Sequence, residues 1–334
     1  MYYFITGASG RLGIVLVKKL YERYQNLILL VANEEEKRKL PVMKDVEIIV
    51  GDVNDKNAIE KGVAKADVVV HLAGIIDYSG NWEILEKVNI KGTKTVAEAC
   101  AKFNKKLIFA STTGVYGKNP LENPVTEKTP TNPTDLYAKS KLEAERVINS
   151  YYGSFPYIIL RIGVIYGKTY YKTYARVVKM IDKGIMPVFG DGKNIIPFVH
   201  AEDVAEAIIL ASRSNISNAT FNIVENRTIT QERIYSYVAE LLEKKYSPLR
   251  IPPTIGKILT ILSPINSEDI NVLASHRVFD TERANKALGW TPAIPLIQGI
   301  KEIVDIYKSK NTNRIEKTKK EELEKESYKE LEVI

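Results

Sequence analysis

The first two thirds of the chain alternate short apolar runs with longer amphipathic stretches. Apolar residues make up most of each run without strict alternation with polar ones, which is typical of strands in a parallel sheet covered by helices on both faces. The predicted strands are Tyr2–Thr6, Leu27–Ala32, Glu47–Val50, Val68–Leu72, Lys106–Ser111, Tyr157–Ile162 and Ala219–Val224. Helices are predicted over Leu12–Tyr24, Lys56–Lys61, Trp82–Phe103 and Asp135–Tyr151. This order predicts an α/β fold built on a doubly wound parallel sheet.

The regular alternation stops after Gly167, and Pro and Gly become more frequent. We expect residues 1–167 to form one domain, with 196–224 returning to it. Residues 168–195 and 225–308 then form a smaller, mostly helical, substrate-binding domain. The segment 309–334 holds seven basic and seven acidic residues and few apolar ones, which predicts a charged, solvated tail.

A glycine-rich turn lies between the first predicted strand and the first predicted helix. It reads Thr6-Gly7-Ala8-Ser9-Gly10-Arg11-Leu12-Gly13, a G-x-x-G-x-x-G pattern. Gly7 permits a tight turn, Gly10 lets a pyrophosphate approach the backbone, and Gly13 lets the helix pack closely on the strand. Because free N–H groups at a helix N-terminus attract phosphate, this context predicts a dinucleotide site on a Rossmann domain.

Two later strand ends fall on the same edge of the sheet, where ligands bind in such folds. Asp52 and Val53 follow the third strand, and the Asp52 carboxylate could accept a hydrogen bond from an adenine amino group. Leu72, Ala73 and Gly74 follow the fourth strand and could lie against a ribose or pyrophosphate. We interpret His71, just before them, as a structural histidine.

Composition narrows the function classes. Hydrophobic residues make up 45% of the chain and charged residues 27%, as in ordinary globular proteins. One cysteine (Cys100) and three scattered histidines argue against a disulfide framework and a metal site. The net charge of +7 comes from basic residues interleaved with acidic ones, which does not favour nucleic-acid binding. No signal peptide or membrane span is evident, so we expect a cytoplasmic protein that does not insert into membranes.

A tyrosine and a lysine four residues apart begin the helix after the fifth strand. Spacing i, i+4 places Tyr137 and Lys141 on one face, and a nearby cation favours the phenolate of a tyrosine. Such a tyrosine can exchange a proton with a substrate oxygen while hydride passes to or from a nicotinamide. Thr112, at the end of the fifth strand, offers a hydroxyl to the same oxygen.

Several segments, in this order, resemble extended short-chain dehydrogenases/reductases of the NAD-dependent epimerase/dehydratase family: TGASGRLG, GDV, HLAG, VNIKGT, FASTTGVYG, YAKSK, LRIGVIYG, FVHAEDVA and ALGWTP. The resemblance extends from Tyr2 to about Tyr307. It implies that Thr112, Tyr137 and Lys141 are catalytic and that Asn89 supports the active-site backbone. It also implies a cofactor site lined by Gly7, Gly10, Arg11, Leu12, Gly13, Asp52, Val53, Leu72 and Ala73.

The family pattern breaks at the end of the second strand. NAD-preferring members usually carry an acid there, which holds the adenosine ribose. This chain has Val31-Ala32-Asn33 instead, which leaves Asn33 as the candidate cofactor contact. Arg11, Lys37 or Arg38 could neutralise the extra phosphate of NADP. The cofactor is therefore expected to be NAD or NADP.

The substrate class is open between two enzyme hypotheses. Where sugar-nucleotide epimerases usually hold a diphosphate, this chain has the aliphatic Val164 and Ile196, and an aliphatic side chain offers no charged donor. This favours a reductase or dehydrogenase acting on a small or lipid-like secondary alcohol. The alternative is a UDP-sugar epimerase that holds the diphosphate differently, through one of four basic residues. They are Lys168, Lys172, Arg176 and Arg277.

A third hypothesis is a non-catalytic NAD(P)-binding sensor, against which the intact catalytic set argues. The segment after Gly74 resembles 3β-hydroxysteroid dehydrogenase and dihydroflavonol reductase relatives, which makes Asp77, Tyr78, Trp82 and Tyr166 candidate substrate contacts. Similar proteins pair through the helix Trp82–Phe103 and the Tyr137 helix, so we expect a homodimer.

Overall fold

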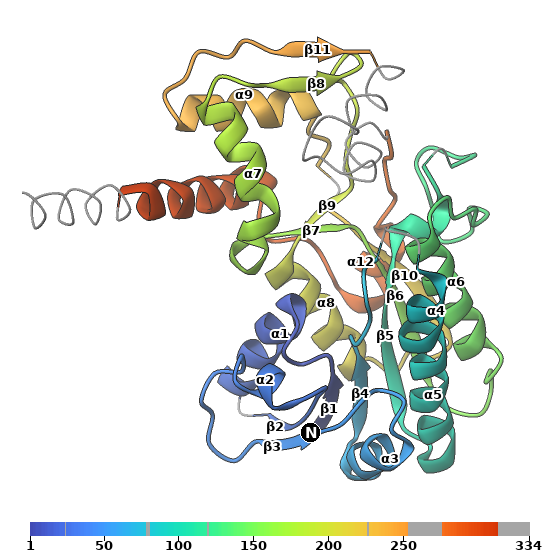
Figure 1. Cartoon of the computed structure of the whole chain (residues 1–334). Helices are drawn as coiled ribbons and strands as arrows, with labels where there is room; N and C mark the ends of the chain where they lie inside the picture. The colour runs from blue at the N-terminus through green and yellow to red at the C-terminus, as the bar shows by residue number, and fades with distance from the viewer. Residues whose placement is uncertain (24, 78–80, 119, 226, 253–275, 313–334) are drawn as a thin grey trace, which may run out of the picture.

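The computed structural model describes all residues except 24, 78–80, 119, 226, 253–275 and 313–334. Its centre is a sheet of seven parallel strands in the order β10-β6-β5-β4-β1-β2-β3 (Figure 1). The strands are β1 (Tyr2–Thr6), β2 (Asn26–Val31), β3 (Glu47–Val50), β4 (Val68–His71), β5 (Lys106–Thr112), β6 (Tyr157–Ile162) and β10 (Ala219–Ile223). All seven match the predicted runs to within about two residues, and the α/β doubly wound fold is confirmed.

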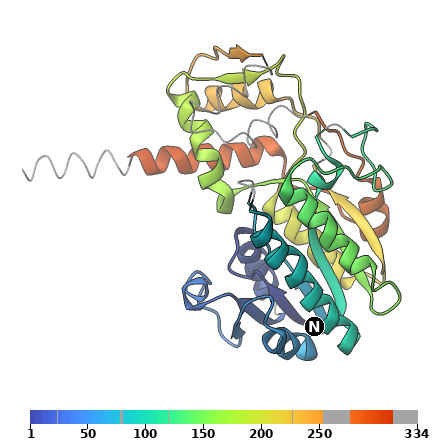
Figure 2. The ribbon, with the colours of Figure 1, turned by 45° about the vertical axis from the view of Figure 1, so that its right-hand side comes forward.

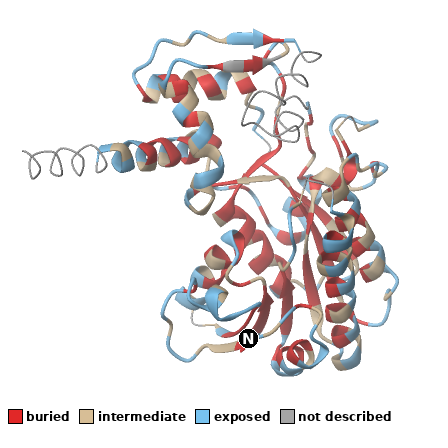
Figure 3. Ribbon diagram, viewed as in Figure 1, coloured by how far each residue is buried: buried red, intermediate tan, exposed pale blue. Residues whose placement is uncertain are grey.

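Helices cover both faces of the sheet, and each face has its own apolar core (Figure 3). The helices α1 (Arg11–Glu22) and α8 (Ala201–Arg213) lie on one face, and α3 (Lys56–Lys65), α5 (Gly92–Phe103) and α6 (Leu136–Asn149) lie on the other. The order in which the chain adds strands to the sheet reverses between the neighbours β1 and β4, because β2 and β3 lie on one side of β1, whereas β4, β5, β6 and β10 lie on the other. In such sheets the crevice at this switch point, outside the carboxyl ends of the strands, is where ligands bind.

A second lobe has its own core and lies beyond the carboxyl ends of the strands (Figures 1 and 2). It contains α7 (Tyr171–Asp182), α9 (Gln231–Leu241), a helix over 296–312, and the parallel pair β8 (Pro187–Phe189) and β11 (Leu249–Ile251). The lobe is therefore less purely helical than the sequence predicts. The pair β7 (Val164–Tyr166) and β9 (Phe198–His200) lies between the lobe and the main sheet. The predicted domain boundaries stay a prediction.

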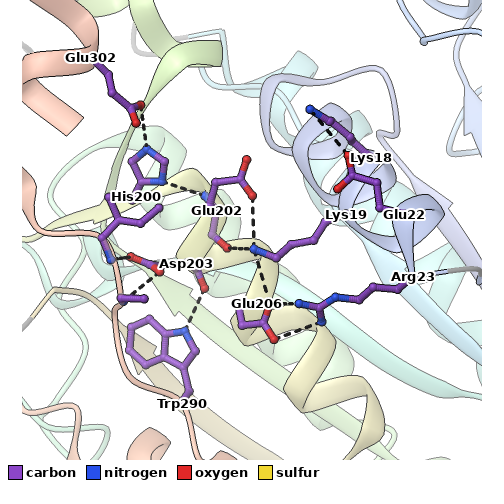
Figure 4. Close-up of polar contacts among 12 residues, drawn as sticks. Lys18, Lys19, Glu22, Arg23, His200, Glu202, Asp203, Glu206, Trp290 and Glu302 are labelled. Carbon is purple, nitrogen blue, oxygen red and sulfur yellow. Dashed lines mark hydrogen bonds and ion pairs between the residues drawn. The ribbon is translucent and has the colours of Figure 1, made fainter. Parts of the chain in front are cut away.

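Two polar clusters fix α8 in place, and Figure 4 shows both. Arg23 of α1 donates two hydrogen bonds to Glu206 of α8, at 2.6 and 3.2 Å. At the other side of α8, the Asp203 carboxylate accepts the backbone N–H groups of Ala293 and Ile294, at 3.0 and 3.1 Å. The indole of Trp290 donates to the Asp203 carbonyl at 2.9 Å. The motifs FVHAEDVA and ALGWTP are thus held together across about 90 residues of chain.

The predicted helix Trp82–Phe103 forms, but not as one regular α-helix. It consists of α4 (Trp82–Leu85), a π-helical turn η1 (Glu86–Lys91) and α5, which follow one another directly. In the part of the chain that the structure describes, no helix is both long and apolar enough to cross a bilayer. The predicted charged tail 309–334 lies outside the described residues from 313 onward.

Candidate active site

The glycine-rich turn is packed so tightly that side chains would not fit at two of its positions. Gly7 has φ +70°, and a Cβ there would lie 2.6 Å from the Ala73 nitrogen. A Cβ on Gly13 would lie 2.2 Å from the Gly7 carbonyl oxygen. Gly10 precedes α1 and has no side chain to cap it, so no cap side chain occupies the first N–H groups of that helix. These features fit the pyrophosphate of a dinucleotide.

The end of β4 borders this turn. Thr6 ties the two strands together, because its Oγ1 accepts the Ala73 N–H at 3.2 Å and lies 2.7 Å from Nδ1 of His71. The other ring nitrogen of His71 lies 3.0 Å from Thr93 Oγ1. Complete burial lowers the pKa of His71 to about 3, so the ring is neutral. His71 therefore braces the turn, in agreement with the structural interpretation of the sequence.

The predicted cofactor residues at the other strand ends are less uniform. Asp52 is exposed at the carboxyl end of β3, and its Oδ1 accepts the Asn54 N–H at 2.8 Å. Val53 is buried, and a Cβ on Gly92 would lie 2.5 Å from it, so Val53 acts chiefly in packing. Asn33 caps the short helix α2 (Glu34–Lys37), with its Oδ1 accepting the Glu36 N–H at 2.9 Å. The Asn33 side chain therefore caps α2, and its predicted contact with the cofactor stays a prediction.

The side chain of Arg11 points away from the glycine-rich turn. Its Nη1 donates to Thr173 Oγ1 at 2.7 Å, and its guanidinium lies 4.7 Å from the centre of the Tyr170 ring. Both partners belong to the second lobe, so Arg11 connects the turn to that lobe. This placement takes Arg11 away from the adenosine end of the crevice, where the sequence offered it as a partner for an NADP phosphate.

Thr112 and the start of α6 meet across Gly114. The Thr112 hydroxyl oxygen accepts the Gly114 N–H at 3.1 Å. A Cβ on Gly114 would lie 3.4 Å from that oxygen and 3.2 Å from the Ala138 side chain. Asp135 starts α6 by accepting the Ala138 N–H at 2.7 Å, so Tyr137 lies in its first turn, partly exposed. The fold thus places the predicted hydroxyl and the predicted phenol at one edge of the sheet.

Lys141 lies one turn further along α6 and is buried between that helix and the sheet. Its Nζ is 4.1 Å from the centre of the Phe109 ring on β5. At the end of β4, a Cβ on Gly74 would lie 3.9 Å from this Nζ. Burial lowers the pKa of Lys141 to about 7, and the nearby Glu145 carboxylate opposes that shift. The Lys141 side chain, which the sequence predicts to be the cation near Tyr137, therefore has a pKa close to neutral pH.

Asn89 lies in the π-helical turn and holds two active-site segments together. Its Oδ1 accepts the Ile75 N–H at 2.8 Å, and its Nδ2 donates to the Ile75 carbonyl at 3.0 Å. The same Nδ2 donates to Ser140 Oγ at 2.8 Å. Ser140 precedes Lys141 in α6, so Asn89 links the β4 loop to the lysine. The sequence analysis missed Ser140 and the π-helical turn, although π turns are common at functional sites.

The sequence analysis also missed a buried ionic network below the active site. Glu145 of α6 and Arg161 of β6 form a 2.7 Å ion pair with side chains 2% and 10% exposed. Ser111 donates to Glu145, and Arg161 donates to the Tyr116 hydroxyl at 2.8 Å. The repeated charges in KSKLEAER and LRIG could have signalled it, because an arginine within an apolar strand needs a buried partner.

The predicted substrate residues are not all in the crevice. Tyr166 is 1% exposed, and its hydroxyl donates to the Ile294 carbonyl at 3.1 Å and to Glu225 at 3.3 Å. It packs in the core of the second lobe, which does not favour the predicted substrate contact, and that contact stays a prediction. Asp77 and Trp82 are partly exposed beside the β4 loop, and Tyr78 lies outside the described residues.

The four basic candidates for holding a diphosphate divide by burial. Lys168, Lys172 and Arg176 are exposed on or next to α7. Arg277 is only 6% exposed, and its Nη1 donates to the Gly117 carbonyl at 3.3 Å. Gly117 ends the short helical turn that follows Thr112, so Arg277, the buried one of these four, contacts the loop that follows Thr112.

Comparison with known proteins agrees with the family resemblance of the motifs described above. The profile of the NAD-dependent epimerase/dehydratase family matches residues 3–224. A putative UDP-glucose 4-epimerase of Methanocaldococcus jannaschii is 29% identical over 92% of this chain and 98% of its own. The human dTDP-D-glucose 4,6-dehydratase is 24% identical over 94% of this chain and 92% of its own.

Solved structures agree on the fold. The UDP-glucose 4-epimerase of Thermotoga maritima, solved with UDP-glucose, has a TM-score of 0.76 and 22% identity. That match covers 93% of this chain and 99% of the other. The UDP-glucuronic acid 4-epimerase of Bacillus cereus, solved with NAD, has a TM-score of 0.76 and 21% identity over 92% of this chain and 99% of its own.

Proposed function

Because the chain belongs to the NAD-dependent epimerase/dehydratase family, we propose that it epimerises a secondary alcohol carbon of a sugar carried on a diphosphate. Family membership confirms that the chain is an enzyme of the extended short-chain dehydrogenase/reductase type and that its cofactor is a nicotinamide dinucleotide. The reaction itself is the proposal. The observation that supports it is that β5 ends in Thr112 and α6 carries Tyr137 and Lys141, with Lys141 Nζ 3.9 Å from the place of a Cβ on Gly74 at the end of β4.

The proposed chemistry needs a base that works near neutral pH. Tyr137 takes the proton of the substrate hydroxyl, while the hydrogen on the same carbon leaves as hydride and a ketone forms. NAD, when bound, supplies the hydride acceptor. Thr112 Oγ1 hydrogen-bonds the reacting oxygen, and Lys141 holds positive charge next to the phenolate. Return of the hydride to the opposite face of the ketone, with return of the proton from Tyr137, gives the epimer without net oxidation.

The diphosphate requires a cation that Val164 and Ile196 do not provide. Arg277 supplies one, because it is buried beside the loop that follows Thr112. A guanidinium can bind phosphate oxygens through paired N–H groups. This assignment supports the hypothesis of a UDP-sugar epimerase that holds the diphosphate through a basic residue. The other three candidates, Lys168, Lys172 and Arg176, are exposed on the surface.

A dehydratase is less well supported. Elimination of water from a sugar requires an acid and a base in addition to the tyrosine. Dehydratases of this family place an Asp-Glu pair after the threonine, and this chain has Thr113 and Gly114 there. Thr113 is 2% exposed, so its hydroxyl does not face the crevice. Neither residue can act as an acid or a base in this reaction.

A second candidate function rests on Val164 and Ile196. Val164 lies in β7, and Ile196 lies just before β9, the strand that pairs with β7. Both side chains pack in or against the core of the second lobe, and Ile196 is 5% exposed. Because neither offers a charged donor, these two positions favour a reductase of a lipid-like ketone over an enzyme that binds a nucleotide diphosphate.

The test is a turnover assay with a matched control. The protein with NAD is incubated with UDP-glucose and UDP-galactose, and the products are separated by chromatography. Tyr137→Phe should lower the rate by about 10²–10⁴-fold, since general acid–base catalysis contributes about that much. Tyr152→Phe, in a side chain 73% exposed, should leave it unchanged. Turnover of ketones but of no diphosphate sugar would reject the epimerase in favour of the reductase.

A second variant separates the two candidates by substrate binding. Arg277→Lys keeps the charge but loses the paired donors. It should raise KM for a UDP-sugar by about tenfold or more and change kcat little, if Arg277 binds the diphosphate. An unchanged KM would remove Arg277 from the proposed site.

A further inference from the structure

The adenosine end of the crevice lies where β2 ends beside the glycine-rich turn. Thr6 of β1 pairs with Leu30 of β2, so Val31 and Ala32 come level with the start of that turn. A carboxylate at this place holds the ribose hydroxyls of NAD and repels the 2′-phosphate of NADP. Ala32 cannot do this. The question is whether another acid of the described structure reaches the same place.

Glu36 is the acid that reaches the glycine-rich turn. Its Oε2 accepts the hydrogen of Ser9 Oγ at 2.7 Å, and Ser9 lies between Gly7 and Gly10. Its Oε1 accepts from the Lys39 ammonium. The Glu36 side chain is 29% exposed, so its carboxylate retains free lone pairs for a ligand. These two donors lower the pKa of Glu36, which keeps it ionised at neutral pH.

The orientation of the Glu36 side chain differs from the one that the start of α2 would favour. Asn33 caps the helix and Glu36 stands three residues later, which is the spacing of a capping box. In that motif the glutamate would reach back to the N–H of the capping residue. Here its two oxygens go to Ser9 and Lys39 instead. The neighbouring Glu34 is 66% exposed and pairs with Lys37 of its own helix at 3.4 Å.

We propose that Glu36 replaces the missing acid of β2, binds the adenosine ribose hydroxyls and makes the site selective for NAD over NADP. The hydrogen bond from Ser9 fixes the carboxylate beside the turn that binds the pyrophosphate. The cap by Asn33 fixes the helix that carries it. A 2′-phosphate would come next to this carboxylate, and the repulsion between like charges in close contact would weaken the binding of NADPH. The inference rests on the dinucleotide site but not on the identity of the substrate.

Lys39 is the residue that could reverse this selectivity. It already pairs with Glu36, so the Glu36–Lys39 pair is close to neutral. The carboxylate lies between the lysine and Ser9, because one of its oxygens bonds each of them. Glu36 is therefore the residue that binds the ribose hydroxyls, and Lys39 supports its carboxylate.

The test measures binding rather than turnover. NADH and NADPH are titrated into the cofactor-free protein by fluorescence, and the ratio of the two dissociation constants is compared among variants. Glu36→Gln keeps the shape of the side chain and removes its charge. It should lower the preference for NADH by at least about tenfold, mainly by improving NADPH binding. Glu34→Gln is the matched control from the same turn and should leave the ratio unchanged.

Other outcomes would overturn the inference. An unchanged ratio in Glu36→Gln excludes Glu36 as the selective residue. Weaker NADPH binding in Lys39→Met, with no effect of Glu36→Gln, would assign the selection to Lys39 and a phosphate. A wild-type protein that binds neither nucleotide would refute the proposed function and this inference together. A shifted ratio in an enzyme without UDP-sugar turnover would support the inference while the epimerase proposal fails.

Discussion

The buried pair of Glu145 and Arg161 gives the sharpest prediction about stability. Three hydrogen bonds join the two side chains, from Arg161 Nε at 3.1 and 3.2 Å and from Nη2 at 2.7 Å. Their side chains are 2% and 10% exposed. Removing one partner of such a pair leaves a charge in an apolar core, which costs about 3–5 kcal/mol. We therefore expect Glu145→Gln to lower the free energy of unfolding by about that much.

The double variant tests the reason for that loss. Arg161→Met alone leaves the Glu145 carboxylate buried, so it should cost a similar amount. In Glu145→Gln with Arg161→Met, neither charge remains to be desolvated. The loss should then fall below the sum of the single losses by at least about 2 kcal/mol.

Urea unfolding at pH 7, followed by circular dichroism, measures all four proteins. The control is the exposed pair on the same helix, Glu143 and Arg146, with side chains 41% and 64% exposed. Glu143→Gln should change the unfolding free energy by no more than about 0.5 kcal/mol. A loss below about 1 kcal/mol in Glu145→Gln, or strict additivity in the double variant, would refute the reasoning from burial.

Three further predictions follow from single sites. Burial lowers the pKa of Lys141 to about 7, well below an unfolded lysine. Between about pH 7 and 10 the unfolded chain therefore binds more protons at this group than the folded chain does, so the free energy of unfolding should increase as the pH rises through that window. Lys141→Met should remove that increase in urea titrations at pH 7 and 9. In Gly62→Ala, the new Cβ would lie 2.2 Å from the Phe4 ring, so thermal and urea unfolding should show a loss of about 1–3 kcal/mol; an unchanged midpoint would contradict this. Tyr166→Phe removes a hydrogen bond to Ile294 inside the second lobe, so it should cost about 1 kcal/mol and leave substrate KM unchanged, whereas a raised KM would restore Tyr166 to the site.

The sheet could be predicted from sequence because local signals and tertiary contacts agree there. Each strand is a short run of apolar residues, and a strand covered on both faces needs that pattern. The glycine-rich turn was predictable for the same reason, since Gly7 needs a positive φ and Gly13 a close approach, both set by neighbours in sequence. The order of the motifs then placed Thr112, Tyr137 and Lys141 on one edge of the sheet.

Several features could not be predicted, mostly because they depend on partners that are distant in sequence. The aromatic ring of Tyr166 looked like a possible substrate contact, but its hydroxyl bonds to Ile294, which is 128 residues away. The π-helical turn within Trp82–Phe103 leaves the apolar period almost unchanged, so periodicity cannot detect it. Glu36 stands five residues after the end of β2, so its place beside the glycine-rich turn is not evident from the sequence. Its contact with Ser9 spans 27 residues and depends on how α2 begins.

The helix α6 shows why the site and the core cannot be separated in this protein. Tyr137, Lys141 and Glu145 are spaced by four residues, so they form one stripe that runs from the crevice into the core. Glu145 is held by Arg161, and its charge opposes the lowering of the lysine pKa that burial causes. A more apolar core at that position would pack as well, but it would leave Lys141 without a nearby carboxylate. The lysine would then be neutral through more of the physiological pH range, and a neutral lysine cannot favour the phenolate of Tyr137. The buried ion pair, which looks like a liability for folding, is on this reasoning a requirement of the proposed chemistry.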